Sequence, residues 1–292
     1  MSSQLLIAAL VSGSVYALIA LGLNLVYGTM RLLNVAHGEF VMIGAYCAYW
    51  GFELLGINPL VSILIAVPLT TLMAIGFYFG IFRTAMRSAE FMERIEANSL
   101  LVFFGTSVIL QNAVALLFTP NQRDYRYADQ IVHILDARVP VNKLIVLGIA
   151  GAVCIGAVAF FRLSTLGIAI KALIQQREAA ALVGIPVARI DLLCFCLGFA
   201  IAGLAGVLVS MTEEISPYMG FPFTVTAFVV VILGGLGNVF GSLFGGLLLG
   251  VLETFGVALT APSYRSIMIY GVFIAVLLLR PQGLFGAGRA RT

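Results

Sequence analysis

The sequence predicts an all-α polytopic membrane protein with about nine transmembrane helices (eight to ten), some of them short or broken. Hydrophobic residues make up 61% of its 292 residues, charged residues only 10%, and the mean hydropathy is +1.09. Soluble domains carry about 25% charged residues, so this composition excludes an ordinary soluble enzyme and a disordered chain. The net charge of +3 is too small for the basic surface of a nucleic-acid-binding protein.

Long runs without Asp, Glu, Lys or Arg locate the spans, because a charge at the bilayer centre costs at least ~2.5 kcal/mol. A helix needs about 20 residues to cross the hydrocarbon core. The run from 215 to 252 has 38 residues, and the glycines at 234, 235 and 237 divide it into a short helix and a full one. The predicted spans lie near residues 5–26, 38–55, 60–82, 99–119, 143–161, 191–211, 223–233, 239–260 and 265–280.

Lys and Arg residues set the expected orientation, because short cytoplasmic loops carry an excess of them. With nine spans, 11 of the 16 basic residues fall on one side and 5 on the other. This bias predicts an outer N-terminus and a cytoplasmic C-terminus. The cytoplasmic set is Arg31, Arg83, Arg87, Arg94, Arg162, Lys171, Arg177, Arg189, Arg280, Arg289 and Arg291, and the outer set is Arg123, Arg126, Arg138, Lys143 and Arg265.

An unusually polar group, Arg31, Asn34, His37 and Glu39, precedes and enters the second predicted span. Asn34 and His37 are three residues apart and can share one face of a helix. An ionisable residue that enters a span is a candidate for a functional site, so these side chains are candidates for contact with a solute. The alternative is an ordinary helix boundary at the membrane surface. No metal site is expected, because the chain has only two histidines and no cluster with ligand spacing.

The connection between the fifth and sixth spans predicts a short cytoplasmic helix over residues 168–183. Gly184 follows it as the expected left-handed C′ residue, and Pro186 follows two residues later. Such a helix suits docking into a groove of another protein. The alternative is an amphipathic helix that lies on the lipid surface. Lys171, Gln175 and Glu178 are expected on one side, and Ala172, Ala179 and Leu182 on the other.

Small residues four apart predict close helix packing within the membrane. They are Gly198, Ala202 and Gly206, then Gly237, Gly241 and Gly245, and then Gly246 and Gly250. The alternative is a surface on which helices slide between two packings. The 31 glycines and nine prolines also fit a bundle with broken helices that line a polar path. Glu53 and Glu253 have no acidic or histidine neighbour at helical spacing, so both are expected to be unpaired.

No Gly-Lys dipeptide occurs, so the chain lacks the G-x-x-x-x-G-K-[ST] phosphate loop. It also lacks the sequence patterns of a nucleophile elbow and of a zinc protease. The chain is therefore not expected to be an enzyme, and it is not expected to hydrolyse nucleotides itself.

With these features in place, the chain resembles the LivH-type permeases of branched-chain amino-acid ABC transporters. The motifs that carry the resemblance follow one another along nearly the whole chain. They are Gly13-Ser-Val-Tyr-Ala-Leu-Ile-Ala20, Leu25-Val-Tyr-Gly28, Asn34-Val-Ala-His-Gly-Glu39, Glu178-Ala-Ala-Ala-Leu-Val-Gly-Ile185, Gly203-Leu-Ala-Gly-Val207, Leu233-Gly-Gly-Leu-Gly-Asn238 and Arg280-Pro-Gln-Gly283.

The resemblance implies a single transmembrane permease domain over residues 1–292 in a bacterial inner membrane, with an ATPase-coupling loop at about 163–190. The implied partners are a second permease, identical or related, two cytoplasmic ATPases and an extracytoplasmic solute-binding protein. This chain would hold no cofactor, since the ATPases would use ATP and Mg²⁺. The expected coupling residues are Lys171, Gln175, Arg177, Glu178, Ala179, Leu182 and Gly184, and the expected solute-path residues are Asn34, His37 and Glu39.

Three alternatives remain open at this point. The same family includes permeases for urea and short amides, and its motifs distinguish these solutes poorly. An ion-coupled secondary transporter would need paired carboxylates within the membrane, which isolated Glu53 and Glu253 do not supply. A passive channel would need no coupling helix.

Overall fold

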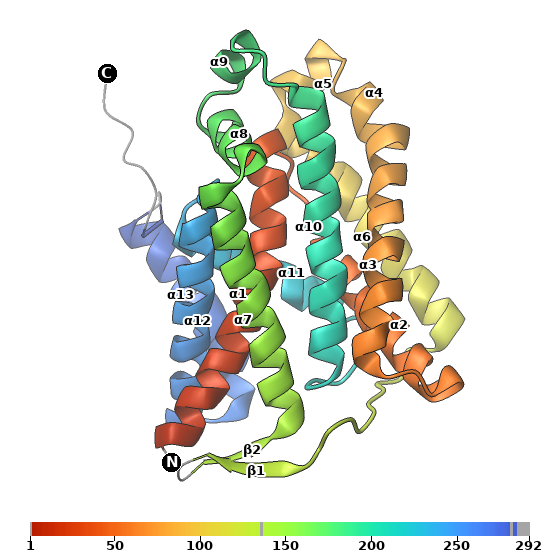
Figure 1. Ribbon diagram of the computed structural model, residues 1–292, viewed down its shortest axis with the longest axis vertical. Coiled ribbons are helices and arrows are strands. Elements are labelled where there is room, and N and C mark those ends of the chain that lie inside the picture. The colour runs from red at the N-terminus through yellow and green to blue at the C-terminus, as the bar shows by residue number, and fades with distance from the viewer. Residues whose placement is uncertain (1, 135–136, 281–282, 285–292) are drawn as a thin grey trace.

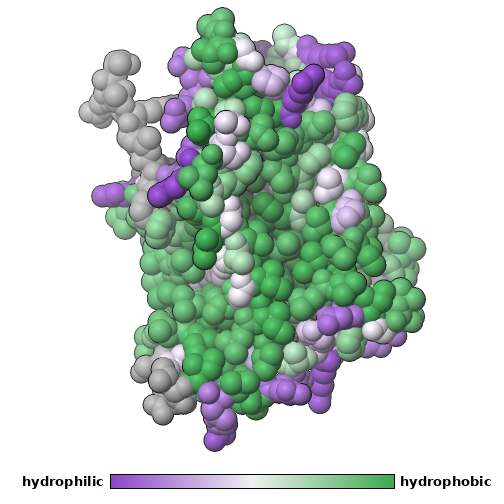
Figure 2. All heavy atoms as spheres, viewed as in Figure 1, coloured by the Kyte–Doolittle hydropathy of each residue, from purple (hydrophilic) through white to green (hydrophobic). Residues whose placement is uncertain are grey.

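The computed structural model describes residues 2–134, 137–280 and 283–284. The chain forms a bundle whose long helices run along one axis (Figure 1). Hydrophobic residues cover the middle of the visible face, and most hydrophilic residues lie at the two ends (Figure 2). This distribution is the one that a lipid bilayer around the middle of the bundle requires.

Every predicted span is helical. The corresponding elements are α1 (Ser2–Met30), α2 (His37–Leu55), α3 (Pro59–Phe77), α6 (Ile95–Phe118), α7 (Val141–Leu163), α10 (Val187–Ser210), α11 (Gly220–Gly234), α12 (Val239–Leu259) and α13 (Arg265–Leu279). A π-helical segment, η1 (Tyr78–Phe82), and α4 (Arg83–Ala85) prolong α3, and η2 (Pro262–Tyr264) precedes α13. The all-α membrane class is therefore confirmed.

Among the described residues, seven helices are long and apolar enough to cross a membrane. The other two predicted spans are shorter or more polar. α11 has 15 residues, and α2 has 19 residues, three of which are His37, Glu39 and Glu53. α13 also has 15 residues, but η2 prolongs it to a span of 18 residues.

Helices α2 and α11 both begin deep inside the bundle. After α1 ends at Met30, the chain turns back, and the His37 side chain reaches the carbonyl of Ile19 in the middle of α1. Eleven helical residues separate Ile19 from Met30, which is roughly 16 Å at 1.5 Å per residue. α11 begins beside the start of α2, because the carbonyl of Gly220 lies against Gly38. The chain therefore contains two interrupted helices whose first turns meet at mid-depth.

Apart from α7, which packs against α1, the spanning helices form two groups of four that have equivalent neighbours. In the first group, α1 packs against α11 and α12 of the second, while α10 of the second group packs against α2 and α3 of the first. α1 and α10 run in opposite directions (Figure 1). The order long helix, interrupted helix, long helix, long helix occurs in α1, α2, α3 and α6 and again in α10, α11, α12 and α13. This arrangement is an inverted repeat, as found in many membrane transporters.

Glycines allow these helices to approach at backbone distance. A Cβ on Gly206 would overlap the carbonyl of Val41, and one on Gly246 would overlap the backbone of Ala17. The glycines at 198, 241, 245 and 250 also lie against a neighbouring backbone. These six glycines therefore mediate helix packing as predicted, whereas Gly237 lies in the turn between α11 and α12, with φ of +79°.

Polar connections gather at the two ends of the bundle (Figure 1). One end, called the α9 end here, holds α4, α5 (Ala89–Glu93), α8 (Thr165–Gln175) and α9 (Arg177–Leu182). The other, the hairpin end, holds the start of α1 and the antiparallel strands β1 (Ile131–Ile134) and β2 (Ala137–Pro140). The loops predicted to be cytoplasmic, 83–98 and 162–190, thus share one end. Arg289 and Arg291 lie outside the described residues.

Candidate functional site

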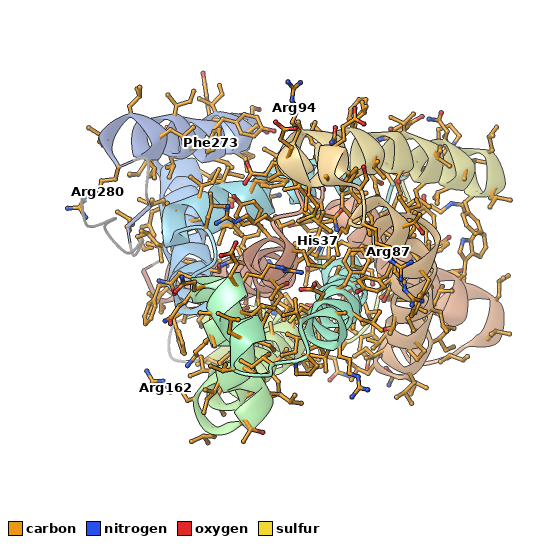
Figure 3. The ribbon with its side chains drawn as sticks, turned by 90° about the horizontal axis from the view of Figure 1, so that it is seen from above. His37, Arg87, Arg94, Arg162, Phe273 and Arg280 are labelled. Atoms are coloured by element: carbon orange, nitrogen blue, oxygen red, sulfur yellow. The ribbon has the colours of Figure 1, made fainter. Side chains whose placement is uncertain are left out.

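His37 and Glu39 lie in the first turn of α2, whereas Asn34 lies in the segment before it, so Asn34 and His37 do not share a helix face as predicted. All three side chains are fully buried. In the view from the α9 end, His37 lies in the middle of the bundle, whereas Arg94, Arg162 and Arg280 project from its rim (Figure 3). The His37 ring lies against Gly22, and its Nε2 donates to the carbonyl of Ile19 at 3.1 Å. The donor role assigns the ring proton to Nε2. His37 therefore fastens the start of α2 to α1.

Glu39 lies between the first turns of the two interrupted helices. It is the third residue of α2, and its carboxylate is packed against Gly220 at the start of α11. Its Oε1 accepts a hydrogen bond from Ser107 of α6 at 2.9 Å, while its Oε2 has no partner among the described residues. Helix N-termini carry partial positive charge. The Glu39 carboxylate therefore lies at the positive ends of two helix dipoles, those of α2 and α11, in the middle of the bundle.

The unwound segment before α2 is held by hydrogen bonds to α6 and α11. The amide of Leu33 donates to Ser99 at 3.0 Å, and Thr224 of α11 donates to the carbonyl of Val35 at 3.0 Å. The side-chain amide group of Asn34 has no hydrogen-bond partner among the described residues, although buried polar groups usually have one. The structure thus brings Asn34, His37 and Glu39 to one place but closes that place to solvent.

Sequence reasoning missed a second buried polar cluster, around Asn24 of α1. Its amide donates to the carbonyl of Asn238 at 2.9 Å and to the Ser242 hydroxyl at 2.5 Å, and its oxygen accepts from the amide of Gly237 at 2.8 Å. These bonds fasten α1 to the turn between α11 and α12. An isolated Asn in an otherwise apolar span was the available signal.

Glu253 corrects one prediction, because it is paired. Arg265 of α13 donates to Glu253 at 2.5 Å, to Glu213 at 3.0 Å and to the hydroxyl of Tyr16 at 2.8 Å. The expectation of an unpaired carboxylate was wrong because the partner lies on the next helix and not at helical spacing. The group joins α1, α12 and α13 near the hairpin end.

At the hairpin end, two connections are bonded to each other. Arg123 and Ile215 exchange backbone hydrogen bonds at 2.8 and 2.7 Å. The hydroxyl of Tyr125 shares a 2.8 Å hydrogen bond with Ser210, and burial raises the pKa of Tyr125 to about 12. The phenol is therefore neutral, and the loop after α6 is fixed onto the end of α10.

At the α9 end, the predicted helix over residues 168–183 is wrong in one respect. It is two helices, α8 and α9, separated at Gln176, whose φ of −153° and ψ of 99° are extended. The predicted C′ role of Gly184 is confirmed. Gly184 has φ of +86°, its amide bonds the carbonyl of Ala181, and the amide of Ile185 bonds that of Ala180, as in a Schellman motif.

The seven expected coupling residues fall into two groups: some are exposed at the end of the molecule, and others face the bundle. Gln175, Glu178 and Gly184 are exposed, Leu182 is 88% exposed, and Ala179 is partly buried. Lys171 instead places its amine 5.3 Å from the Phe240 ring. Arg177 also turns inward, toward α1 and α10. Val183, which is next to Leu182 and was not among the expected coupling residues, is 77% exposed.

Arg177 makes the most direct connection between α9 and the membrane helices. It donates to Asp191 of α10 from both terminal guanidinium nitrogens, and its Nη1 also donates to the carbonyl of Thr29 of α1 at 2.6 Å. The Asp191 side chain is 1% exposed and that of Arg177 is 38% exposed. A cavity of about 390 Å³ lies beside them, lined by Arg31, Met86, Met92, Ile95, Gln175 and Glu178 among others.

Within the described parts of the chain, no three His, Cys, Asp or Glu side chains could hold a metal ion together.

Known proteins resemble this chain over most of its length. A family model described as the permease component of branched-chain amino acid transport systems matches residues 5–277. The high-affinity branched-chain amino acid transport system permease protein BraD of Pseudomonas aeruginosa is 33% identical over 97% of this chain and 95% of its own. The corresponding protein LivH of Escherichia coli K12 is 32% identical over 94% and 92%.

A third similar protein is the LivM permease of Salmonella typhimurium, which is 26% identical over 92% of this chain and 67% of its own length. No solved structure matches the chain. The family model and the relatives cover nearly all of the helices described above. The chain therefore belongs to the family of permease components of branched-chain amino acid transport systems.

Proposed function

We propose that this multi-pass membrane protein is one of the two permease subunits of a bacterial inner-membrane ABC importer. Together the two permeases form the path for branched-chain or related amino acids. The observation that carries the proposal is the match along nearly the whole chain to permeases that are named for this transport. The similarity to LivM as well as LivH favours a related chain as the second permease.

Separate subunits supply the energy and the solute in this proposal. Two ATPases bind ATP and Mg²⁺ and dock on the exposed part of α9, and a solute-binding protein delivers the amino acid at the hairpin end. The hairpin-end loops with Arg123, Asp124, Arg126 and Asp129 are the candidate surface for that delivery. The permease needs different contacts in its two states and not tight binding in either.

The solute path is proposed to open where α2 and α11 meet. Asn34, His37 and Glu39 are buried there, and several of their polar atoms lack partners among the described residues. Separation of the two first turns exposes these atoms to a passing solute. The half-helix N-termini then face its carboxylate, as anionic groups are favoured there.

The test is uptake into proteoliposomes that contain this chain, the partner permease and the ATPases, with the binding protein outside and ATP inside. Uptake of labelled leucine, isoleucine and valine is compared with that of urea and acetamide. We expect leucine uptake that requires both ATP and the binding protein. An ATPase variant that cannot hydrolyse ATP is the control. Uptake of urea but not leucine, or leucine uptake driven by an ion gradient without ATP, would contradict the proposal.

A further inference from the structure

We propose that Arg177 is the joint that transmits motion of α9 to α1 and α10, and that it is not a contact with the ATPase. The inference rests on the proposed function, since it assumes that an ATPase moves α9. It divides the expected coupling residues into an outer group that docks and an inner residue that transmits.

The geometry of Arg177 is that of a clamp. It is the first residue of α9 and follows the extended residue Gln176. Its two terminal nitrogens bind the two carboxylate oxygens of Asp191 in the first turns of α10, and one of them also binds the Thr29 carbonyl in the last turn of α1. One guanidinium thus connects α9 with two other helices, α1 and α10.

Each partner suits a planar cation. A paired fork of hydrogen bonds from Arg to a carboxylate fixes direction as well as distance, which a Lys amine does not. The Thr29 carbonyl is among the last carbonyls of α1, where the helix dipole favours positive charge. Asp191 is buried, so loss of the Arg177 cation would leave its carboxylate uncompensated at a large cost in free energy. Because this connection fixes both distance and direction, a movement of α9 displaces α1 and α10 as well.

Other connections of α9 to the bundle are weaker. Ala180 is buried in an apolar cluster with Ile190 and Cys194. Within the described part of the chain, the hydrogen bonds from α9 side chains to membrane helices are those of Arg177. On the side of α5 and α6, the 390 Å³ cavity separates the helices, and its wall includes the flexible side chains of Met86 and Met92. Motion of α9 therefore passes to α1 and α10 and not to α6.

α1 and α10 are the equivalent first helices of the two repeats. α1 holds the start of α2 through Ile19 and His37, and α10 packs its Gly206 directly on α2 at Val41. A displacement of α1 and α10 by α9 therefore acts on the place where α2 and α11 meet. The clamp and the buried polar cluster are joined by two continuous helices.

The experiment uses the assembled complex of this chain with its partner permease, ATPases and binding protein in lipid nanodiscs and proteoliposomes. The variants are Arg177→Gln, Arg177→Lys, Asp191→Asn and the exchange Arg177→Asp with Asp191→Arg. The control is Arg189→Gln, which removes an exposed arginine from the first turn of α10. Three quantities are measured: the ATPase that co-purifies, the leucine transported per ATP hydrolysed, and the ATP-induced change at two fluorescent labels.

The labels sit on cysteines introduced at Ala181 of α9, which is exposed and is not one of the residues assigned to the ATPase contact, and at the exposed Leu54 near the end of α2. We expect Arg177→Gln, Arg177→Lys and Asp191→Asn to keep the ATPase bound and to keep the ATP response at position 181. Leucine transported per ATP falls about tenfold, within the usual range of coupling between distant sites. The response at Leu54 is lost, and the charge exchange restores part of both. Arg189→Gln behaves as the wild type.

Three results overturn the inference. They are loss of the ATPase from Arg177→Gln while the partner permease still co-purifies, normal coupling in both Arg177→Gln and Asp191→Asn, and a normal Leu54 response in those variants. If Arg177→Gln fails to fold, Asp191→Asn and the exchange decide by the same measurements. Failure of the wild-type complex to assemble or to transport would instead contradict the proposed function.

Discussion

At the scale of single residues, backbone contacts in the middle of the bundle depend on the absence of a side chain. Gly38 in the first turn of α2 and Gly220 in the first turn of α11 lie against each other, and a Cβ on Gly38 would overlap the Gly220 carbonyl. The backbone amide of Gly38 also donates to the Thr224 hydroxyl at 2.8 Å. The meeting of the two interrupted helices therefore tolerates no methyl group at residue 38.

Gly38→Ala should destabilise the permease by about 1–3 kcal/mol, because overpacking forces the two backbones apart. The measurement is thermal unfolding of the purified protein in detergent. Gly76→Ala is the matched control, since Gly76 lies in α3 with no atom near its Cβ position. That control should be neutral or stabilising by up to about 1 kcal/mol. Equal unfolding temperatures for Gly38→Ala and the wild type would contradict the close approach.

Residue-level predictions succeeded where local sequence determines the geometry. Gly184 was predicted as a helix C′ residue, and its positive φ follows from the end of α9. The pairing of Glu253 with Arg265 and the bonds of Asn24 to Asn238 join residues on different helices. Spacing along one helix carries no information on such pairs, because they arise only when separate helices pack.

At the scale of elements, the break between α8 and α9 shows what propensity alone misses. Residues 168–183 contain no glycine or proline, so the sequence favours one helix. In the structure, Gln176 is extended and Arg177 is turned onto α1 and α10. Bonds to distant helices outweigh the small propensity cost of the break. The outcome is a short α9 whose tip projects from the bundle.

The exposed tip of α9 should be the ATPase contact. Leu182→Asp is expected to weaken ATPase association about tenfold, since loss of a central apolar interface contact costs more than ~1 kcal/mol. Reversal of charge at Glu178 and the bulky change Ala179→Trp should act in the same direction. The measurement is ATPase co-purified with each variant permease. Val132→Asp, an equivalent change on β1 at the opposite end, is the control and should leave association unchanged.

Normal ATPase association in all three variants, with normal uptake, would remove α9 from the docking role. Loss of association in Val132→Asp as well would point to general misfolding. The expected contrast between the two ends follows because the β hairpin and α9 lie at opposite ends of the bundle (Figure 1).

At the scale of the whole molecule, hydropathy predicted the helical segments but not their depth. All nine predicted segments are helical, because runs without charge reveal where lipid surrounds the chain. Hydropathy did not reveal that α2 and α11 start at mid-depth, nor that the two halves repeat with opposite direction. Those features depend on contacts between segments that are as far apart as Gly38 and Gly220.

The orientation of the molecule is the remaining prediction at this scale. Alternation of the helices puts the basic loops 83–98 and 162–190 at one end and the hairpin at the other, and the excess of Lys and Arg predicts that the α9 end is cytoplasmic. Single cysteines at Ile131 on β1 and at Leu182 on α9 report the two ends, because both side chains are well exposed. The background is a variant in which Cys47, Cys154, Cys194 and Cys196 are replaced.

With a membrane-impermeant maleimide, the cysteine at position 131 should react in intact spheroplasts, and the cysteine at position 182 only after the membrane is opened. A variant that keeps Cys194 alone is the control, because that thiol is buried and should react in neither case. The reverse pattern would mean that charge bias misassigned the two sides of an otherwise correct bundle. Reaction of both positions in intact cells would contradict the bundle itself, because its two ends must lie on opposite sides of the bilayer.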